Sequence, residues 1–151
     1  MQKLIRFLAI DVKSRHDAGE IWPLIEHRAP DIIESFYADV RRSNVYLPLT
    51  SQIIENLKTK QKEHWQYLFE SRFDQKYFNN ASLIGIKHFE IGLDAKLYIA
   101  GYMKIKSGFS REVLSSPLSL PSKTRLIVTL DKYVALDMAL AISSYTSILI
   151  D

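Results

Sequence analysis

The last thirty residues of the chain, 122–151, contain neither glycine nor proline. Such a run favours one long helix, because these two residues interrupt helices more strongly than any others. Elsewhere both are scarce, at five each, and no segment alternates strictly between apolar and polar residues as a half-buried strand does. The chain is therefore predicted to be all-α.

Apolar residues recur at helical spacing along most of the chain, which predicts six to eight helices in one domain of 151 residues. Suitable N-caps are Thr50 or Ser51, Asp74 and Asp94, and Gly92 suits a helix end. One or two helices are expected within residues 7–28. The serine- and proline-rich segment 107–122 is predicted to be a loop. Further helices are expected in 30–43, 49–71, 74–92, 94–106 and 122–151.

Composition excludes several classes of partner and site. The net charge of +3 is small, and the basic residues are scattered, which argues against a nucleic-acid partner. The absence of cysteine excludes disulfides and thiolate metal sites, and it fits a reducing compartment. The first sixteen residues are too charged and too few for a membrane span. A cytoplasmic protein without a membrane partner is expected.

Chemical interest centres on His88, which lies in the apolar stretch LIGIKHFEIGLDAKLYIAGYM. A histidine on the apolar face of a helix is usually a core residue with both ring nitrogens hydrogen-bonded. Its neighbours Ile84, Ile91 and Leu93 have no polar side chain that could serve. Coordination of a metal by one nitrogen would satisfy the ring, and haem proteins hold iron in this way. The spacing alone leaves both interpretations open.

A resemblance to a known family rests on three segments, in the order LKTKQKEHWQYLFESRFDQKYF, IGIKHFEIGLDAKLYIAGYM and LDMALAISSY. With them the chain, from about Ile32 to Tyr145, resembles the globin domain of the globin-coupled sensors. The most specific part is the H-x-x-I-G-L run that begins at His88, followed closely by Tyr98. The resemblance implies a globin fold with haem b between two long helices.

The same resemblance assigns roles to individual residues. It implies that His88 is the proximal iron ligand, that Tyr37 hydrogen-bonds bound oxygen, and that Leu57 shapes the distal pocket. Phe89 and Tyr98 are interpreted first as core residues. They are also candidates for contact with the porphyrin. Lys60 departs from the family, which often has serine or threonine there, so its side chain either reaches the haem edge or extends into solvent.

His64 lies two turns after Leu57 on the same helix face. It is a candidate sixth iron ligand, as is Lys60, but its distance along the helix, about 10 Å from Leu57, favours a structural or surface role. His16 and His27 stand among polar residues and are expected to be solvated.

The final segment carries more apolar surface than one core needs, which predicts a homodimer through the last helix. Two apolar stripes run along it, Leu126, Leu130, Tyr133, Val134, Leu140 and Tyr145 in one, and Ile127, Met138, Ala141, Ile142 and Leu149 in the other. No helix stop precedes Asp151, so residues 1–151 are expected to be the N-terminal sensor part of a longer signalling protein.

The leading functional hypothesis is a non-enzymatic sensor domain that binds O2, and also CO or NO, at haem iron. Two alternatives remain at this stage. One is a standalone globin for oxygen storage or nitric oxide detoxification, and the other is a haem-free regulatory domain that binds an apolar ligand.

Overall fold

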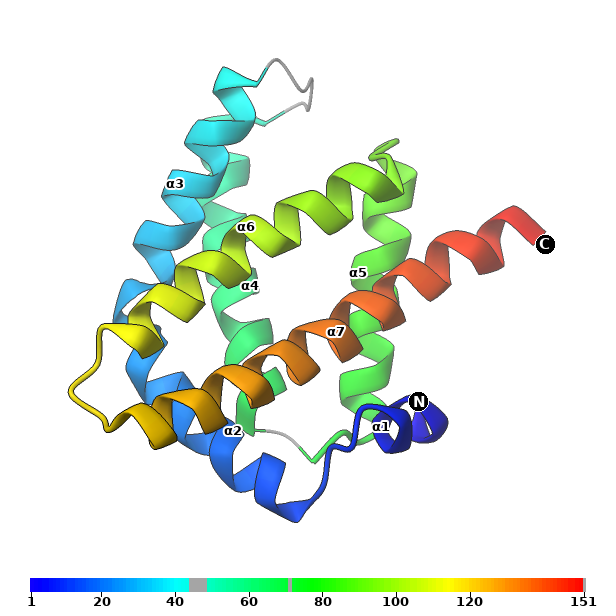
Figure 1. Ribbon diagram of the computed structural model, residues 1–151. Helices are drawn as coiled ribbons and strands as arrows, with labels where there is room; N and C mark the ends of the chain where they lie inside the picture. The colour runs from blue at the N-terminus through cyan, green and yellow to red at the C-terminus, as the bar shows by residue number, and fades with distance from the viewer. Residues whose placement is uncertain (44–48, 71, 151) are drawn as a thin grey trace.

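The computed structural model describes residues 1–43, 49–70 and 72–150, with side chains described up to Tyr145. All regular structure among these residues is helical, which confirms the all-α prediction (Figure 1). The elements are α1 (Gln2–Phe7), α2 (Val12–Ile25), the short 3-10 helix η1 (Glu26–Arg28), α3 (Ala29–Arg42), α4 (Ser51–Glu70), α5 (Gln75–Glu90), α6 (Ala95–Leu114) and α7 (Leu120–Ile150).

Three helices begin at the side-chain caps that the sequence predicts. The hydroxyl oxygen of Thr50 accepts a hydrogen bond from the backbone N–H of Ile53 at 3.2 Å, at the start of α4. The Asp74 carboxylate caps α5 through the backbone N–H of Tyr77 at 2.9 Å. Asp94 caps α6 in the same manner. After α5, Gly92 has a φ of 77°, a left-handed conformation that glycine adopts without strain.

The predicted loop at 107–122 is wrong for most of its length, because α6 continues to Leu114 and α7 begins at Leu120. Ser107 satisfies its hydroxyl within the helix by donating to the Met103 carbonyl at 3.0 Å. Gly108 lies against Ile32 of α3, and this tertiary contact favours a continuous α6 over the local serine and glycine preferences. Pro121 occupies the first turn of α7, where no backbone N–H is required.

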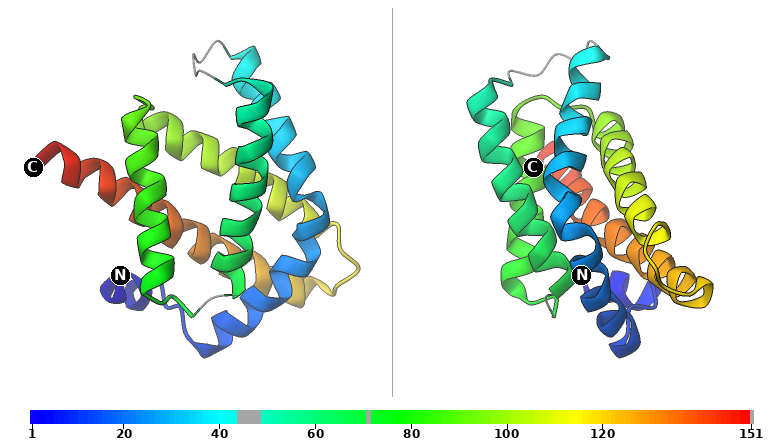
Figure 2. Two further views of the ribbon diagram at one scale, coloured as in Figure 1. Left: turned by 180° about the vertical axis from the view of Figure 1, so that it is seen from behind. Right: turned by 90° about the vertical axis from the view of Figure 1, so that its left-hand side faces the viewer.

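Helix α7 crosses the molecule and packs against α5, α6 and α2, while α3 packs against α4 and α6 (Figures 1 and 2). Its first predicted apolar stripe lies in the core: Leu126, Leu130, Tyr133, Val134, Leu140 and Tyr145 are all buried. Arg125 joins α7 to α2 by donating to Asp17 at 2.7 Å and to Glu20 at 3.1 Å.

Helices α4 and α5 follow one another in the chain but lie apart over most of their length (Figures 1 and 2). The contacts between them are few, because α4 packs chiefly on α2 and α3, whereas α5 packs chiefly on α7. No helix in the described part of the chain is long and apolar enough to cross a membrane.

Candidate functional site

The position of His88 is fixed by a close crossing of α5 and α7. Gly85, one turn before His88, lies so near the backbone of Ala141 that a Cβ atom there would be 2.8 Å from the Ala141 carbonyl carbon. Only a glycine permits this approach, because any side chain would push the two helices apart. The face of α5 that carries His88 is thereby held directly against α7.

The His88 ring has one satisfied nitrogen. Its Nδ1 lies 2.7 Å from the backbone carbonyl of Ile84, and because a carbonyl only accepts, Nδ1 carries the proton. The expectation that the neighbours of His88 offer no partner therefore holds for their side chains only. Nε2 has no hydrogen bond to another described residue, and burial lowers the pKa of His88, so the ring is neutral with a free lone pair at Nε2.

Aromatic side chains lie near His88. The Tyr98 ring of α6 lies edge-on to His88, with centroids 5.0 Å apart. Tyr145 of α7 contacts both Tyr98, at 6.2 Å, and Phe89, at 5.9 Å. Its hydroxyl is buried without a hydrogen-bond partner among the described residues. The sequence analysis assigned Tyr145 only to the apolar stripe of the last helix, and its place beside His88 follows from the packing of α7 on α5.

A second group of candidate residues lies on α3 and α4. Tyr37 is buried, and its hydroxyl oxygen accepts a hydrogen bond from Gln61 Nε2 at 3.2 Å. Burial raises the pKa of Tyr37, so the phenol keeps its proton at neutral pH. Gln61 Oε1 is buried without a partner among the described residues. Leu57, one turn before Gln61, is half-buried against the core, whereas Lys60 is exposed.

The structure thus assembles the predicted residues into two groups. His88, Phe89 and Tyr98 share one, and Tyr37 and Leu57 share the other with Gln61, which sequence reasoning missed. Gln61 follows Leu57 by four residues on α4, and this spacing could have indicated that both side chains lie on one face. Lys60 belongs to neither group.

A buried polar cluster lies near both groups and centres on Asp137 of α7, which is only 3% exposed. His64 Nε2 of α4 lies 2.9 and 3.0 Å from the two carboxylate oxygens. The hydroxyls of Tyr77 (α5) and Tyr102 (α6) each donate to Asp137 at 2.6 Å. We refer to these four residues as the Asp137 cluster.

Charge stabilises the Asp137 cluster. Burial alone raises the pKa of Asp137, but His64 and the two tyrosine hydroxyls lower it further than burial raises it. Burial lowers the pKa of His64, and Asp137 raises it by more. The two groups therefore form a buried ion pair at pH values below the raised pKa of His64. His64 has the structural role that its spacing favoured, and its Nε2 is occupied by Asp137, which does not suit a sixth iron ligand.

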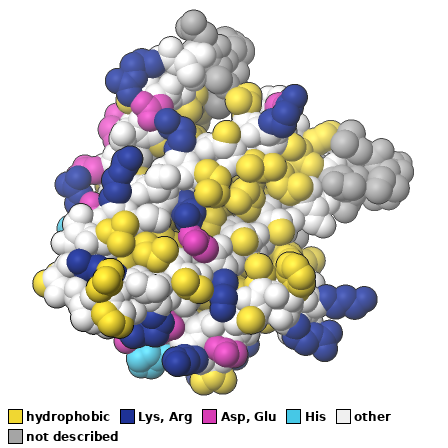
Figure 3. All heavy atoms as spheres, in the orientation of Figure 1, with side chains coloured by type: hydrophobic (Ala, Val, Ile, Leu, Met, Phe, Trp, Pro, Cys, Tyr) yellow, Lys and Arg dark blue, Asp and Glu magenta, His cyan; other side chains and the backbone are white. Residues whose placement is uncertain are grey.

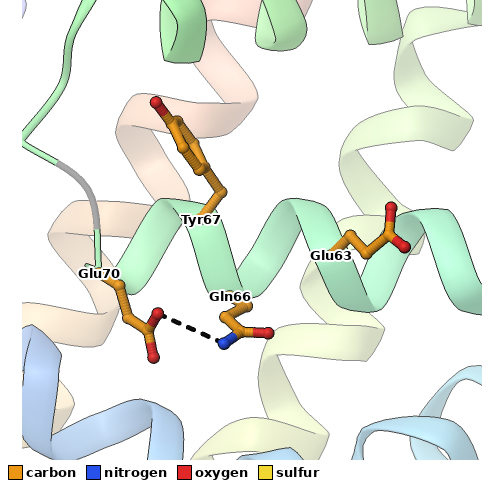
Figure 4. Close-up of a pocket in the computed structure, with 4 residues that line it drawn as sticks. All are labelled: Glu63, Gln66, Tyr67 and Glu70. Atoms are coloured by element: carbon orange, nitrogen blue, oxygen red, sulfur yellow. Dashed lines mark hydrogen bonds between the residues drawn. The ribbon is translucent and has the colours of Figure 1, made fainter.

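A pocket of about 410 Å³ lies elsewhere, on the outer face of α4, and its lining residues all come from that helix (Figure 4). Gln66 donates to Glu70 at 3.4 Å, and the Tyr67 hydroxyl donates to Asp74 at 2.8 Å. None of these residues contacts His88 or Tyr37. In the described part of the chain, no cluster of three or more His, Asp or Glu residues could hold a metal ion.

A family model described as Protoglobin matches residues 1–149. The chain belongs to the protoglobin family. Its structure is similar to that of the globin domain of the Geobacter sulfurreducens globin-coupled sensor, with a TM-score of 0.78 and 16% identity over 96% of this chain and 97% of the other. This likeness confirms the globin fold. No curated protein matches the chain.

Membership of the family implies a haem cofactor, and the residues of this protoglobin fit one. The His88 ring is neutral and its Nε2 is free. Its Nδ1 is hydrogen-bonded to the Ile84 carbonyl, and a hydrogen bond at the other ring nitrogen is what orients a histidine ligand. The buried, unpartnered Gln61 Oε1 and Tyr145 hydroxyl add polar atoms that a bound group would satisfy. The aromatic rings beside His88 suit a flat, apolar macrocycle.

Proposed function

We propose that the chain is a sensor domain that binds haem b and, through it, O2 reversibly. The observation that carries this proposal is the state of His88: a half-buried, neutral imidazole whose Nδ1 is fixed by Ile84 and whose Nε2 has no hydrogen bond to another described residue. When bound, haem supplies an iron atom at which a diatomic gas binds. The domain has no turnover of its own, and CO and NO are further ligands of the same site.

On the α5 side, His88 Nε2 would hold the iron, and the hydrogen bond from Nδ1–H to the Ile84 carbonyl keeps Nε2 a lone-pair donor. Tyr98 and Phe89 would contact the haem macrocycle, and Tyr145 packs against both of these residues. Mutual packing fixes these side chains, because each buried ring touches at least one other. The His88 imidazole is consequently held in one orientation.

On the distal side, Tyr37 selects oxygen. Its hydroxyl oxygen already accepts from Gln61, so its own hydrogen is free to be donated to a gas molecule. Bound oxygen is polarised and accepts hydrogen bonds well, whereas carbon monoxide is a poor acceptor. Leu57 presents an apolar side chain beside this donor and limits access. Lys60, being exposed, extends into solvent and leaves Tyr37 as the donor.

The ligation state passes to a homodimer interface on α6 and α7 and from there to an output domain. Figure 3 shows a hydrophobic patch over α6 and the C-terminal half of α7. On α6, Leu97, Ile99 and Met103 are 41–44% exposed, and in the C-terminal half of α7 Met138 and Ile142 are half-buried. Because α5 touches the α7 backbone one turn before His88, a displacement of His88 acts on α7 directly. The lack of cysteine fits action in the cytoplasm.

Titration of the purified chain with haem tests this function. We expect a Soret band at one equivalent, and reversible spectral changes with O2 in the ferrous state. His88→Ala should lose stable haem binding or show an altered ferrous spectrum, whereas His16→Ala, at an exposed histidine on α2, should behave as wild type. A His88→Ala variant with the wild-type ferrous spectrum would refute the assignment. No Soret band in the wild type would favour a haem-free regulatory domain.

A further inference from the structure

The Asp137 cluster is built from the same four helix faces as the gas site. His64 follows Gln61 by three residues on α4, and Tyr102 follows Tyr98 by four on α6. Tyr77 precedes His88 by eleven residues on α5, and Asp137 precedes Tyr145 by eight on α7. Spacings of three, four, eight and eleven all return to the same side of a helix. Each member of the cluster is therefore aligned with a residue of the site.

The carboxylate of Asp137 is the only atom group that all three partners share. It accepts from His64 on the distal helix, from Tyr77 on the proximal helix and from Tyr102 on α6. Since α4 and α5 have few contacts of their own, the cluster is a principal link between the two sides of the site. A neutral amide could not accept from all three, so the negative charge is required for the arrangement.

No other charged group on the packed helices competes for Asp137. From α6, Tyr98 faces it in addition to Tyr102, and Tyr133 lies on α7 near Tyr77. These phenols stay neutral in the physiological range because burial raises their pKa values. From α2, Asp17 is directed to Arg125 and Thr129 instead. His64 is therefore the member of the cluster that loses its proton as the pH rises above the ordinary histidine value of 6.5.

We propose that Asp137 is a positioning residue of the gas site, and that its ion pair with His64 holds α4 so that Gln61 and Tyr37 keep their place relative to His88. Loss of the His64 proton leaves a weaker hydrogen bond between α4 and α7, from a neutral imidazole to the Asp137 carboxylate. Gln61, one turn away, is then held less firmly, and Tyr37 donates to the gas less well. Oxygen should leave faster as the pH rises. This inference rests on the proposed function.

The test is the oxygen release rate of the haem-loaded chain, measured by stopped flow between pH 6 and pH 9.5. We expect the wild-type rate to rise about 5-fold along a single titration, because a hydrogen bond from a charged imidazole exceeds one from a neutral imidazole by about 1 kcal/mol, which corresponds to about 5-fold. Its midpoint should lie above the ordinary histidine value of 6.5. His64→Gln and Asp137→Asn should flatten the profile, and exposed His16→Gln should not.

The outcomes separate this proposal from others. A purely structural role for the cluster predicts lower stability in His64→Gln with an unchanged pH profile, and that result would overturn the proposal. A flat wild-type profile would overturn it as well, while the gas-binding function would stand. A chain that binds no haem would overturn both. If Asp137→Asn does not fold, the milder His64→Gln decides the matter.

Discussion

Substitution of Gly85 by alanine tests the helix crossing on which the proximal site depends. A Cβ atom at this position would lie 2.8 and 2.9 Å from the carbonyl carbon and Cα of Ala141, and closer still to its oxygen. Carbon atoms pack at about 3.5–4.0 Å, so α5 and α7 must separate by about 1 Å. The obstacle is backbone, which cannot rotate away as a side chain can. We expect a loss of about 3 kcal/mol in the free energy of unfolding, the upper end of the range for overpacking.

Gly19→Ala is the matched control, because it adds the same methyl group at a helix interior where no atom lies within 4 Å. It should stabilise the protein by about 0.5–1 kcal/mol, the usual advantage of alanine over glycine in a helix. Both variants are compared by denaturant unfolding and by the rate of haem transfer to a competing apoprotein. Gly85→Ala should release haem faster, since His88 lies three residues further along α5. If its unfolding free energy stays within about 0.5 kcal/mol of wild type, the tight crossing does not exist in solution.

Three further predictions concern the distal donor, the buried ion pair and the dimer. Tyr37→Phe should accelerate oxygen release about 10- to 150-fold, the equivalent of one hydrogen bond to a partly charged acceptor; stopped flow with CO should show a far smaller change, and equal changes would indicate a steric role. The stability that the ion pair contributes should be lost at both acid and alkaline pH. The acid loss occurs as the pH falls below the ordinary aspartate value of 3.8, because the pKa of Asp137 is lowered. The alkaline loss occurs as the pH rises above 6.5 and passes through the raised pKa of His64. Thermal unfolding at a series of pH values should show this dependence in wild type and lose the alkaline part in His64→Gln; an unchanged alkaline limb would contradict it. Met103→Glu, at an apolar position of α6 that is 41% exposed, should dissociate the dimer in ultracentrifugation with the haem spectrum intact, whereas Ile53→Glu, at an equally exposed apolar position of α4, should not; a wild-type monomer at high micromolar concentration would refute the interface.

Much of the local structure was determined by the sequence itself. The caps at Thr50, Asp74 and Asp94 and the stop at Gly92 depend on residues within one turn, so their effect can be predicted without knowing the fold. The helical spacing of apolar residues in the last helix is by itself enough to predict which of its residues are buried. His88 was conspicuous for the same reason, as a polar group on an apolar face.

The tertiary structure decided what depends on residues far apart in the chain. The extension of α6 through residues 107–114 follows from packing on α3, which overrides weak local preferences. The contact of Gly85 with Ala141 joins positions 56 residues apart. In the sequence, Asp137 is only a polar residue that interrupts an apolar helix. In the structure, α4, α5 and α6 place His64, Tyr77 and Tyr102 in contact with it. Burial then makes that carboxylate a shared acceptor, because a buried charge is stable only where other groups pair with it, and those groups are chosen by packing and not by spacing.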